Sequence, residues 1–247
     1  MSTSAPATRG PAGPALFNGR RSFFTTPHLF DSSNKATALS AYRTLPYPAY
    51  AIFKVISDIN AYPEFLPYVQ RAKVLEQSPR PDGFHNERWP ALASLTIGFQ
   101  DKIAESYTSR VYCVPPVPHK GRAGVGFVEA ISGTDSPKPS FTAEEDVSHY
   151  DVKDGSIPQD HVKGPLTFLR TRWTVGGYPH KPAPGSADET HAAKLEPNLK
   201  AEEKTNVSLA VEYRFQNPVY EMLGQASGGK VAEMMIEAFE KRLKAIM

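Results

Sequence analysis

The pattern of apolar and polar positions predicts an antiparallel sheet. Val207, Leu209, Val211, Tyr213 and Phe215 alternate with more polar residues, which is the period of a strand with one buried face. The same period, or a run of strand-forming residues, marks further segments. The expected strands are residues 38–45, 70–77, 93–99, 103–114, 125–132, 165–175 and 207–215.

Helical spacing appears at two places. Ile52, Val55, Ile56 and Ile59 fall at i, i+3, i+4 and i+7, so a short helix is expected after Pro48, followed by a second turn over residues 61–68. A long helix is expected from residue 218 to the end of the chain. Its predicted apolar positions are Met222, Leu223, Val231, Met234, Met235, Ala238, Phe239, Leu243 and Ile246.

This order of elements predicts the fold class. An antiparallel sheet with one apolar face, followed by a single long amphipathic helix, is covered most simply by that helix. We therefore expect residues 35–247 to form one α+β domain, with a curved sheet of about six to seven strands around the C-terminal helix and two short helices after the first strand. Proline-rich loop inserts are expected at residues 133–164 and 178–204.

The N-terminal residues have a different composition. Residues 1–34 contain Arg9, Arg20 and Arg21 and a single acid, Asp31, which is typical of a mitochondrial transit peptide with cleavage near Phe24. The alternative is a leader that is only disordered. The whole chain has a net charge of +2, so nothing in its charge favours a nucleic-acid partner. Its single cysteine excludes an internal disulfide.

The sequence predicts no catalytic residue, no metal site and no catalytic cofactor. The histidines lie in the leader or in expected loops, lack the spacing of metal ligands and are expected to be solvated: His28, His85, His119, His149, His161, His180 and His191. Cys113 has no Cys-x-x-Cys partner, and no glycine-rich phosphate loop precedes a helix.

Several phrases resemble those of the mitochondrial coenzyme Q-binding proteins of the START-like helix-grip superfamily. They include residues 62–68 (YPEFLPY), 107–111 (YTSRV) and 213–218 (YRFQNP). The resemblance implies a helix-grip fold and a ubiquinone-binding lipid chaperone without chemical turnover. It also implies a peripheral position on the matrix side of the mitochondrial inner membrane. There the protein would support respiratory electron transport and ubiquinone biosynthesis, with complexes of those processes as partners.

Such a carrier needs a tunnel between sheet and helix. The expected lining is Phe65, Leu66, Leu95, Ile97, Phe99, Glu105, Tyr107, Phe168, Trp173, Val211, Tyr213, Met234, Met235 and Phe239, with Tyr62, Phe65 and Tyr68 as a gate that faces the membrane. For the apolar residues the alternative is an ordinary packed core, and for Glu105 a solvated position at a strand end.

Two other functional classes stay open. One is a START-like cyclase or hydratase that uses a tyrosine or glutamate in the same cavity on an aromatic or polyketide substrate. The other is an assembly factor that binds a peptide in the groove.

Overall fold

The computed structural model describes residues 36–99, 103–117, 124–135, 139, 141, 145–151, 166–178, 204–216 and 218–247. The predicted transit peptide and most of both predicted inserts lie outside the described residues. The side chains of Phe99, Ile103, Tyr178 and residues 218–229 are also outside the description.

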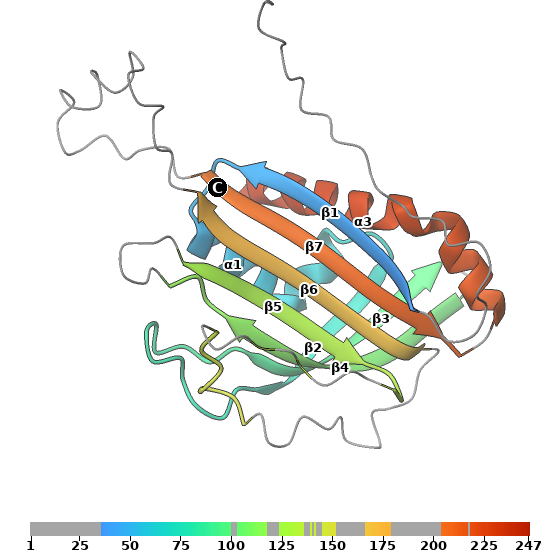
Figure 1. The fold of residues 1–247 in the computed structure, drawn as a ribbon, viewed down its shortest axis with the longest axis horizontal. Helices are drawn as coiled ribbons and strands as arrows, with labels where there is room; N and C mark the ends of the chain where they lie inside the picture. The colour runs from blue at the N-terminus through green and yellow to red at the C-terminus, as the bar shows by residue number, and fades with distance from the viewer. Residues whose placement is uncertain are drawn as a thin grey trace, which may run out of the picture.

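The described strands form one seven-stranded antiparallel sheet in the order β1-β7-β6-β5-β4-β3-β2. Their bounds are β1 Thr37–Leu45, β2 Val69–Gln77, β3 Pro90–Phe99, β4 Ile103–Val114, β5 Val125–Ser132, β6 Leu166–Tyr178 and β7 Lys204–Phe215. Strands β2 to β7 pair in chain order, and β1 closes the other edge by pairing with β7. The sheet curls, so that β2 and β3 cross behind the strands at the other edge (Figure 1). The predicted fold class is confirmed.

The helical segments in the described part of the chain are α1 Ala49–Ser57, the 3-10 helix η1 Ile59–Glu64 and α3 Pro218–Ile246. The second turn was predicted to reach residue 68, and this is wrong. The 3-10 helix ends at Glu64, and Phe65 already has an extended φ of −140°. Pro67 in turn disfavours a helical conformation at Leu66, so the helix does not resume. The chain then turns through Tyr68, which has a φ of 67°.

The core fills part of the space between the sheet and the helices. Helix α3 buries Ala232, Ile236, Phe239 and Leu243, each at most 1% exposed, and this spacing is one helical stripe. Met234 and Ile246 were predicted on that stripe but are 39% and 47% exposed. Met234 lies two residues before Ile236, about 200° around the helix, and so points away from the core.

The face of the sheet that points away from α3 is covered in part by residues 145–151, which belong to the first predicted insert. Tyr150 is buried and its ring packs against Tyr112 at 5.4 Å. Its hydroxyl accepts the Cys113 backbone N–H at 2.9 Å and donates to the Pro90 carbonyl at 2.8 Å. His149, predicted to be solvated, is 4% exposed, and its Nε2 donates to the Cys113 carbonyl at 2.8 Å. Residues 145–151 are therefore packed structure, because these hydrogen bonds attach them to the sheet.

Candidate ligand-binding cavity

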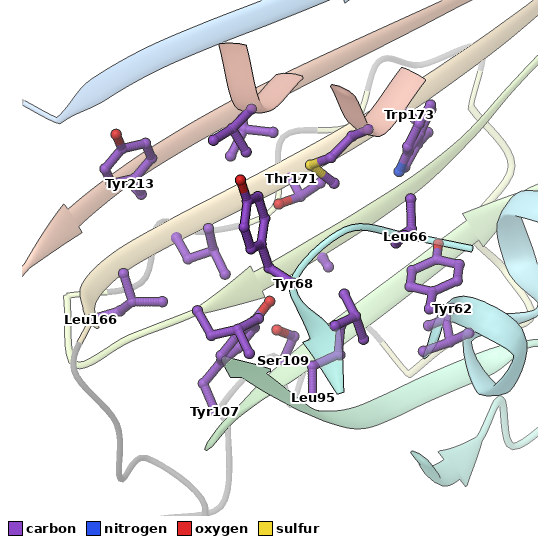
Figure 2. Close-up of a pocket in the computed structure, with 18 of the residues that line it drawn as sticks. Tyr62, Leu66, Tyr68, Leu95, Tyr107, Ser109, Leu166, Thr171, Trp173 and Tyr213 are labelled. Atoms are coloured by element: carbon purple, nitrogen blue, oxygen red, sulfur yellow. The ribbon is translucent and has the colours of Figure 1, made fainter. Parts of the chain in front are cut away.

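A cavity of about 200 Å³ lies between the concave face of the sheet, helix α3 and the turn after η1 (Figure 2). Strand register explains its wall. Residues opposite one another in an antiparallel sheet share a face, and pairing aligns Val111, Ala130, Thr171, Val211 and Leu39 in one row across five strands. Every member of this row lines the cavity.

The other walls come from adjacent rows and from the helices. Toward one end lie Tyr107 and Leu95, which face each other across β4 and β3. Toward the other end lie Val128 and its pairing partner Trp173. The helical side is supplied by Ile59, Tyr62 and Leu66 near η1 and by Val231 and Met235 of α3. The cavity is thus enclosed by residues that are far apart in the sequence.

Small side chains in the middle of the wall explain why this space is not filled. Ser109, Ala130 and Thr171 occupy the centre of the sheet, whereas the larger Trp173 and Phe239 meet at 5.2 Å between their ring centroids and close one end. Protein interiors are normally packed to crystal-like density. These short side chains on neighbouring strands do not reach helix α3, so a gap is left between them and the helix.

Hydroxyl groups are the main polar feature of this apolar wall. The Tyr62 hydroxyl is used internally and donates to the Ile56 carbonyl at 2.6 Å. Burial raises the pKa of Tyr107 to about 12, so its hydroxyl is protonated at neutral pH. Ser109 is fully buried, and its Oγ has no hydrogen-bond partner within the described part of the chain. The cavity can therefore offer a hydrogen bond to an oxygen atom inside an apolar space.

Tyr68 and Met234 stand at the open end. The Tyr68 hydroxyl contacts the Met234 sulfur at 3.9 Å, and the two side chains are 38% and 39% exposed. Tyr68 has a left-handed backbone conformation, which is uncommon for a residue with a side chain. Its carbonyl accepts the Gly98 N–H at 2.9 Å, which ties this turn to β3. In Figure 2, Tyr68 projects from the turn toward the space between the strands.

Many of the residues predicted to line a tunnel do surround the cavity. They are Leu66, Leu95, Ile97, Tyr107, Trp173, Val211, Tyr213 and Met235, together with Tyr62 and Tyr68 of the predicted gate.

The structure places other predicted residues elsewhere. Phe65 packs against Phe239 at 6.4 Å, and both belong to the core cluster. The Phe99 side chain lies outside the description. Glu105 is half-buried and pairs with Ile97 of β3, but it is not among the residues that line the cavity. Phe168 adjoins a register shift between β6 and β7, so Leu166 and Leu169 line the cavity in its place. Met234 is exposed beside the mouth.

The sequence prediction missed the small and polar lining residues Ser109, Ala130 and Thr171 because it selected large apolar side chains. The signal for Ser109 was present, since it shares the period of two with Tyr107 and Val111. Thr171 carried the same signal, because Leu169, Thr171 and Trp173 alternate with Arg170 and Arg172 in β6.

The described residues hold no group of three or more His, Cys, Asp or Glu side chains that could bind a metal ion. Burial raises the pKa of the Cys113 thiol to about 12, which makes it a poor nucleophile. Among the described helices none has the length and hydropathy needed to cross a bilayer.

Curated proteins similar to this chain fall into two kinds. The coenzyme Q-binding protein coq10 of Schizosaccharomyces pombe is 36% identical over 75 residues, 30% of this chain and 42% of that protein. The ribosome association toxin RatA of Pseudomonas aeruginosa is 44% identical over 71 residues, 29% of this chain and 42% of that protein. These two alignments span less than half of either relative. The coenzyme Q-binding protein COQ10 of Eremothecium gossypii is 20% identical over 201 residues, 81% of this chain and 69% of that protein.

Solved structures are similar at lower identity. A START superfamily protein from Mycobacterium smegmatis aligns over 85% of this chain and 99% of its own, with 15% identity and a TM-score of 0.46. The aromatase/cyclase Zhui from Streptomyces sp. R1128 aligns over 85% of this chain and 94% of its own, with 12% identity and a TM-score of 0.45. Neither similarity bears on function.

One family covers most of the chain. The match to the family described as polyketide cyclase/dehydrase and lipid transport extends over residues 45–240, from the end of β1 to the last turns of α3. The START-like superfamily predicted from the motifs is therefore confirmed: the chain belongs to the polyketide cyclase/dehydrase and lipid transport family.

Proposed function

We propose that the protein binds a polyprenyl quinone of the ubiquinone type in this cavity and carries it without chemical turnover. The observation that supports this most is the apolar cavity with buried hydroxyl groups and an open end at Tyr68 and Met234. A quinone has a matching composition, because its ring oxygens accept hydrogen bonds and its tail is hydrocarbon. Two of the similar curated proteins are named for coenzyme Q binding.

The size of the cavity limits how much of the ligand is enclosed. Its volume of about 200 Å³ is below the ~300–1,000 Å³ of a site for a drug-sized ligand. We infer that the ring and the adjoining part of the tail are enclosed, and that the rest of the tail stays in lipid. Each buried CH₂ contributes about 0.8 kcal/mol relative to water. A bilayer offers nearly the same environment, so the net affinity is modest and the ligand exchanges.

The cellular setting is part of the same proposal. The composition of residues 1–34 and the names of the two coenzyme Q-binding relatives favour import into mitochondria. There the protein would act at the matrix side of the inner membrane and serve ubiquinone biosynthesis or respiratory complexes. In this proposal Tyr68, with Met234 beside it, is the outer part of the gate. Tyr62 and Phe65 lie behind it.

A cavity-filling substitution tests the proposal. Ala130→Phe places a ring in the middle of the cavity wall and should remove most quinone retention, because ring and ligand compete for the same space. Quinone that co-purifies with the protein, and short-tail ubiquinone added afterwards, would be measured by organic extraction and redox difference spectra.

The matched control is Ala210→Phe, since Ala210 is exposed on the other face of β7. Retention should equal that of the wild type in this variant. Equal retention in Ala130→Phe and wild type, with both folded, would show that quinone does not occupy the cavity.

Two other functions are outcomes of the same measurements. Turnover of an aromatic substrate by a protein that retains no quinone would favour a cyclase or hydratase. The similarity to RatA raises ribosome binding as a second candidate, and co-sedimentation with ribosomes at physiological salt tests it. We favour the quinone because the apolar cavity suits a lipid, whereas a net charge of +2 does little to attract ribosomal RNA.

A further inference from the structure

Ser109 stands out in the cavity wall because the described residues leave its hydroxyl unpaired. Its side chain is 0% exposed, and its Oγ has no hydrogen-bond partner among them. Tyr107 and Val111, two residues away on either side in β4, line the same wall, so strand alternation directs Ser109 into the cavity (Figure 2). Other lining residues whose polar atoms are equally buried are paired, as Tyr62 is with Ile56.

A buried hydroxyl without a partner is unfavourable, because it has lost its hydrogen bonds to water. Alanine would remove that cost at the same position. Alanine is already used next to it, at Ala93 opposite Ser109 in β3 and at Ala130 in the cavity wall. A hydroxyl at this point therefore indicates a ligand atom that accepts a hydrogen bond.

The position of Ser109 along the cavity sets the direction of the ligand. On one side of it the wall is apolar, with Val111, Val128 and Trp173. On the other side the wall leads past Tyr107 to the mouth at Tyr68. Trp173 and Phe239 close the apolar end, so a long isoprenoid tail has to lie on the side of the mouth.

We infer that Ser109 Oγ donates a hydrogen bond to a ring carbonyl oxygen of the bound quinone, so that the ring is held inside and the tail leaves past Tyr68. The inference rests on the proposed function and names the group that recognises the ring. The Ser109 hydroxyl can donate this bond because a quinone carbonyl oxygen is an acceptor.

The test compares two probes. One is a short-tail ubiquinone, and the other is a hydrocarbon with the same tail on a toluene ring. Quenching of Trp173, which lines the cavity, reports quinone binding, and competition reports hydrocarbon binding. Ser109→Ala should weaken quinone binding about five- to tenfold, the effect of one hydrogen bond, and leave hydrocarbon binding unchanged.

Ser106→Ala is the matched control. Ser106 is on the same strand but is exposed and bonded to Thr96 at 2.8 Å, so this variant should bind both probes like the wild type. Ser109→Cys separates loss of the hydrogen bond from loss of side-chain volume, because a thiol group fills the space of the hydroxyl but is only a weak hydrogen-bond donor. It should behave like Ser109→Ala.

Infrared spectra of the bound quinone give a second measurement. The carbonyl stretch should move to a higher wavenumber in Ser109→Ala and Ser109→Cys, because a hydrogen bond lowers it in the wild type. The ligand-free Ser109→Ala protein should unfold at the same temperature as the wild type or a higher one, because the substitution removes an unpaired buried hydroxyl.

The outcomes separate the two proposals. Unchanged quinone affinity with an unchanged carbonyl band in Ser109→Ala would overturn the role of Ser109 and leave the carrier function standing. Equal loss of both probes would assign Ser109 to packing and also overturn it. A wild-type protein that binds neither probe would overturn the proposed function, and the inference with it.

Discussion

Glu129 illustrates how one residue is set by its surroundings. Val128 and Ala130 line the cavity, so Glu129 lies on the opposite face of β5, where it is 1% exposed. Arg170 Nε and Arg172 Nη1 each lie 3.5 Å from its Oε1. Desolvation by burial raises the pKa of Glu129, although the two arginines act in the opposite direction. Burial thus has a larger effect on this carboxyl group than its partners.

This shift predicts a pH dependence of stability. In the folded state Glu129 holds its proton above the ordinary carboxyl pKa of 4.5, so its contribution is present below that pKa and is lost as pH rises through the folded pKa. Glu129→Gln removes the titration. The wild type loses this contribution as pH rises, and the variant does not. The free energy of unfolding of the variant minus that of the wild type, measured in urea, should therefore increase from pH 4 to pH 7. A difference in free energy that stays constant or decreases over this range would contradict a raised pKa of Glu129.

At the scale of elements, the C-terminal half of α3 is held from two sides. Arg43 of β1 forms an ion pair with Glu233 and lies 3.7 Å from Glu240 and 3.9 Å from Glu237. On the other side Arg242 pairs with Glu64 of η1 at 2.8 Å. These contacts and the buried stripe fix the helix beyond the cavity, so the gap below Val231 and Met235 does not collapse.

Arg43→Ala should lower the free energy of unfolding by about 1 kcal/mol, a modest value because the pair is partly exposed. It also leaves three carboxylates of α3 without their shared cation. The effect should shrink in 1 M salt, which screens these charges. Arg71→Ala is the control, since Arg71 is exposed on the opposite edge strand β2. If the two substitutions lowered the free energy of unfolding equally in denaturant titrations, the ion pairs of Arg43 would not be what holds α3.

At the scale of the whole molecule, the two faces of the sheet have different tasks. One face is packed by residues 145–151 through His149 and Tyr150, which are both buried. The other encloses the cavity, with its mouth at Tyr68 and Met234. Exposed apolar side chains beside an open cavity suit contact with lipid. The proposed carrier would therefore approach a membrane with this end.

The double variant Tyr68→Ser with Met234→Ser tests that orientation. It should lower binding to vesicles with mitochondrial phospholipid composition by about fivefold, because it removes apolar area that would leave water. Phe84→Ser is the control, since Phe84 is 63% exposed and lies outside the cavity lining. Co-sedimentation with vesicles measures both. If Phe84→Ser lost as much vesicle binding as the double variant, the end at Tyr68 and Met234 would not be the one that contacts the membrane.

Local patterns were enough to predict the elements and their order. The alternation in β7, the spacing of Ile52 and Ile56 in α1 and the apolar spacing along α3 are properties of neighbouring residues. They predicted the fold class, because an apolar sheet face and one long helix have few ways to cover each other. The large lining residues of β3 and β7 followed from the same period.

Long-range packing decided the rest. The stripe of α3 that is buried, the register shift beside Phe168 and the burial of His149 depend on partners far away in the chain. By itself the sequence determined which segments are strands and helices and which faces are apolar, because these are local preferences. Only the tertiary structure decided that short side chains from separate strands meet at Ser109, Ala130 and Thr171 and leave a cavity there, because an unfilled space is a property of how all the elements pack together.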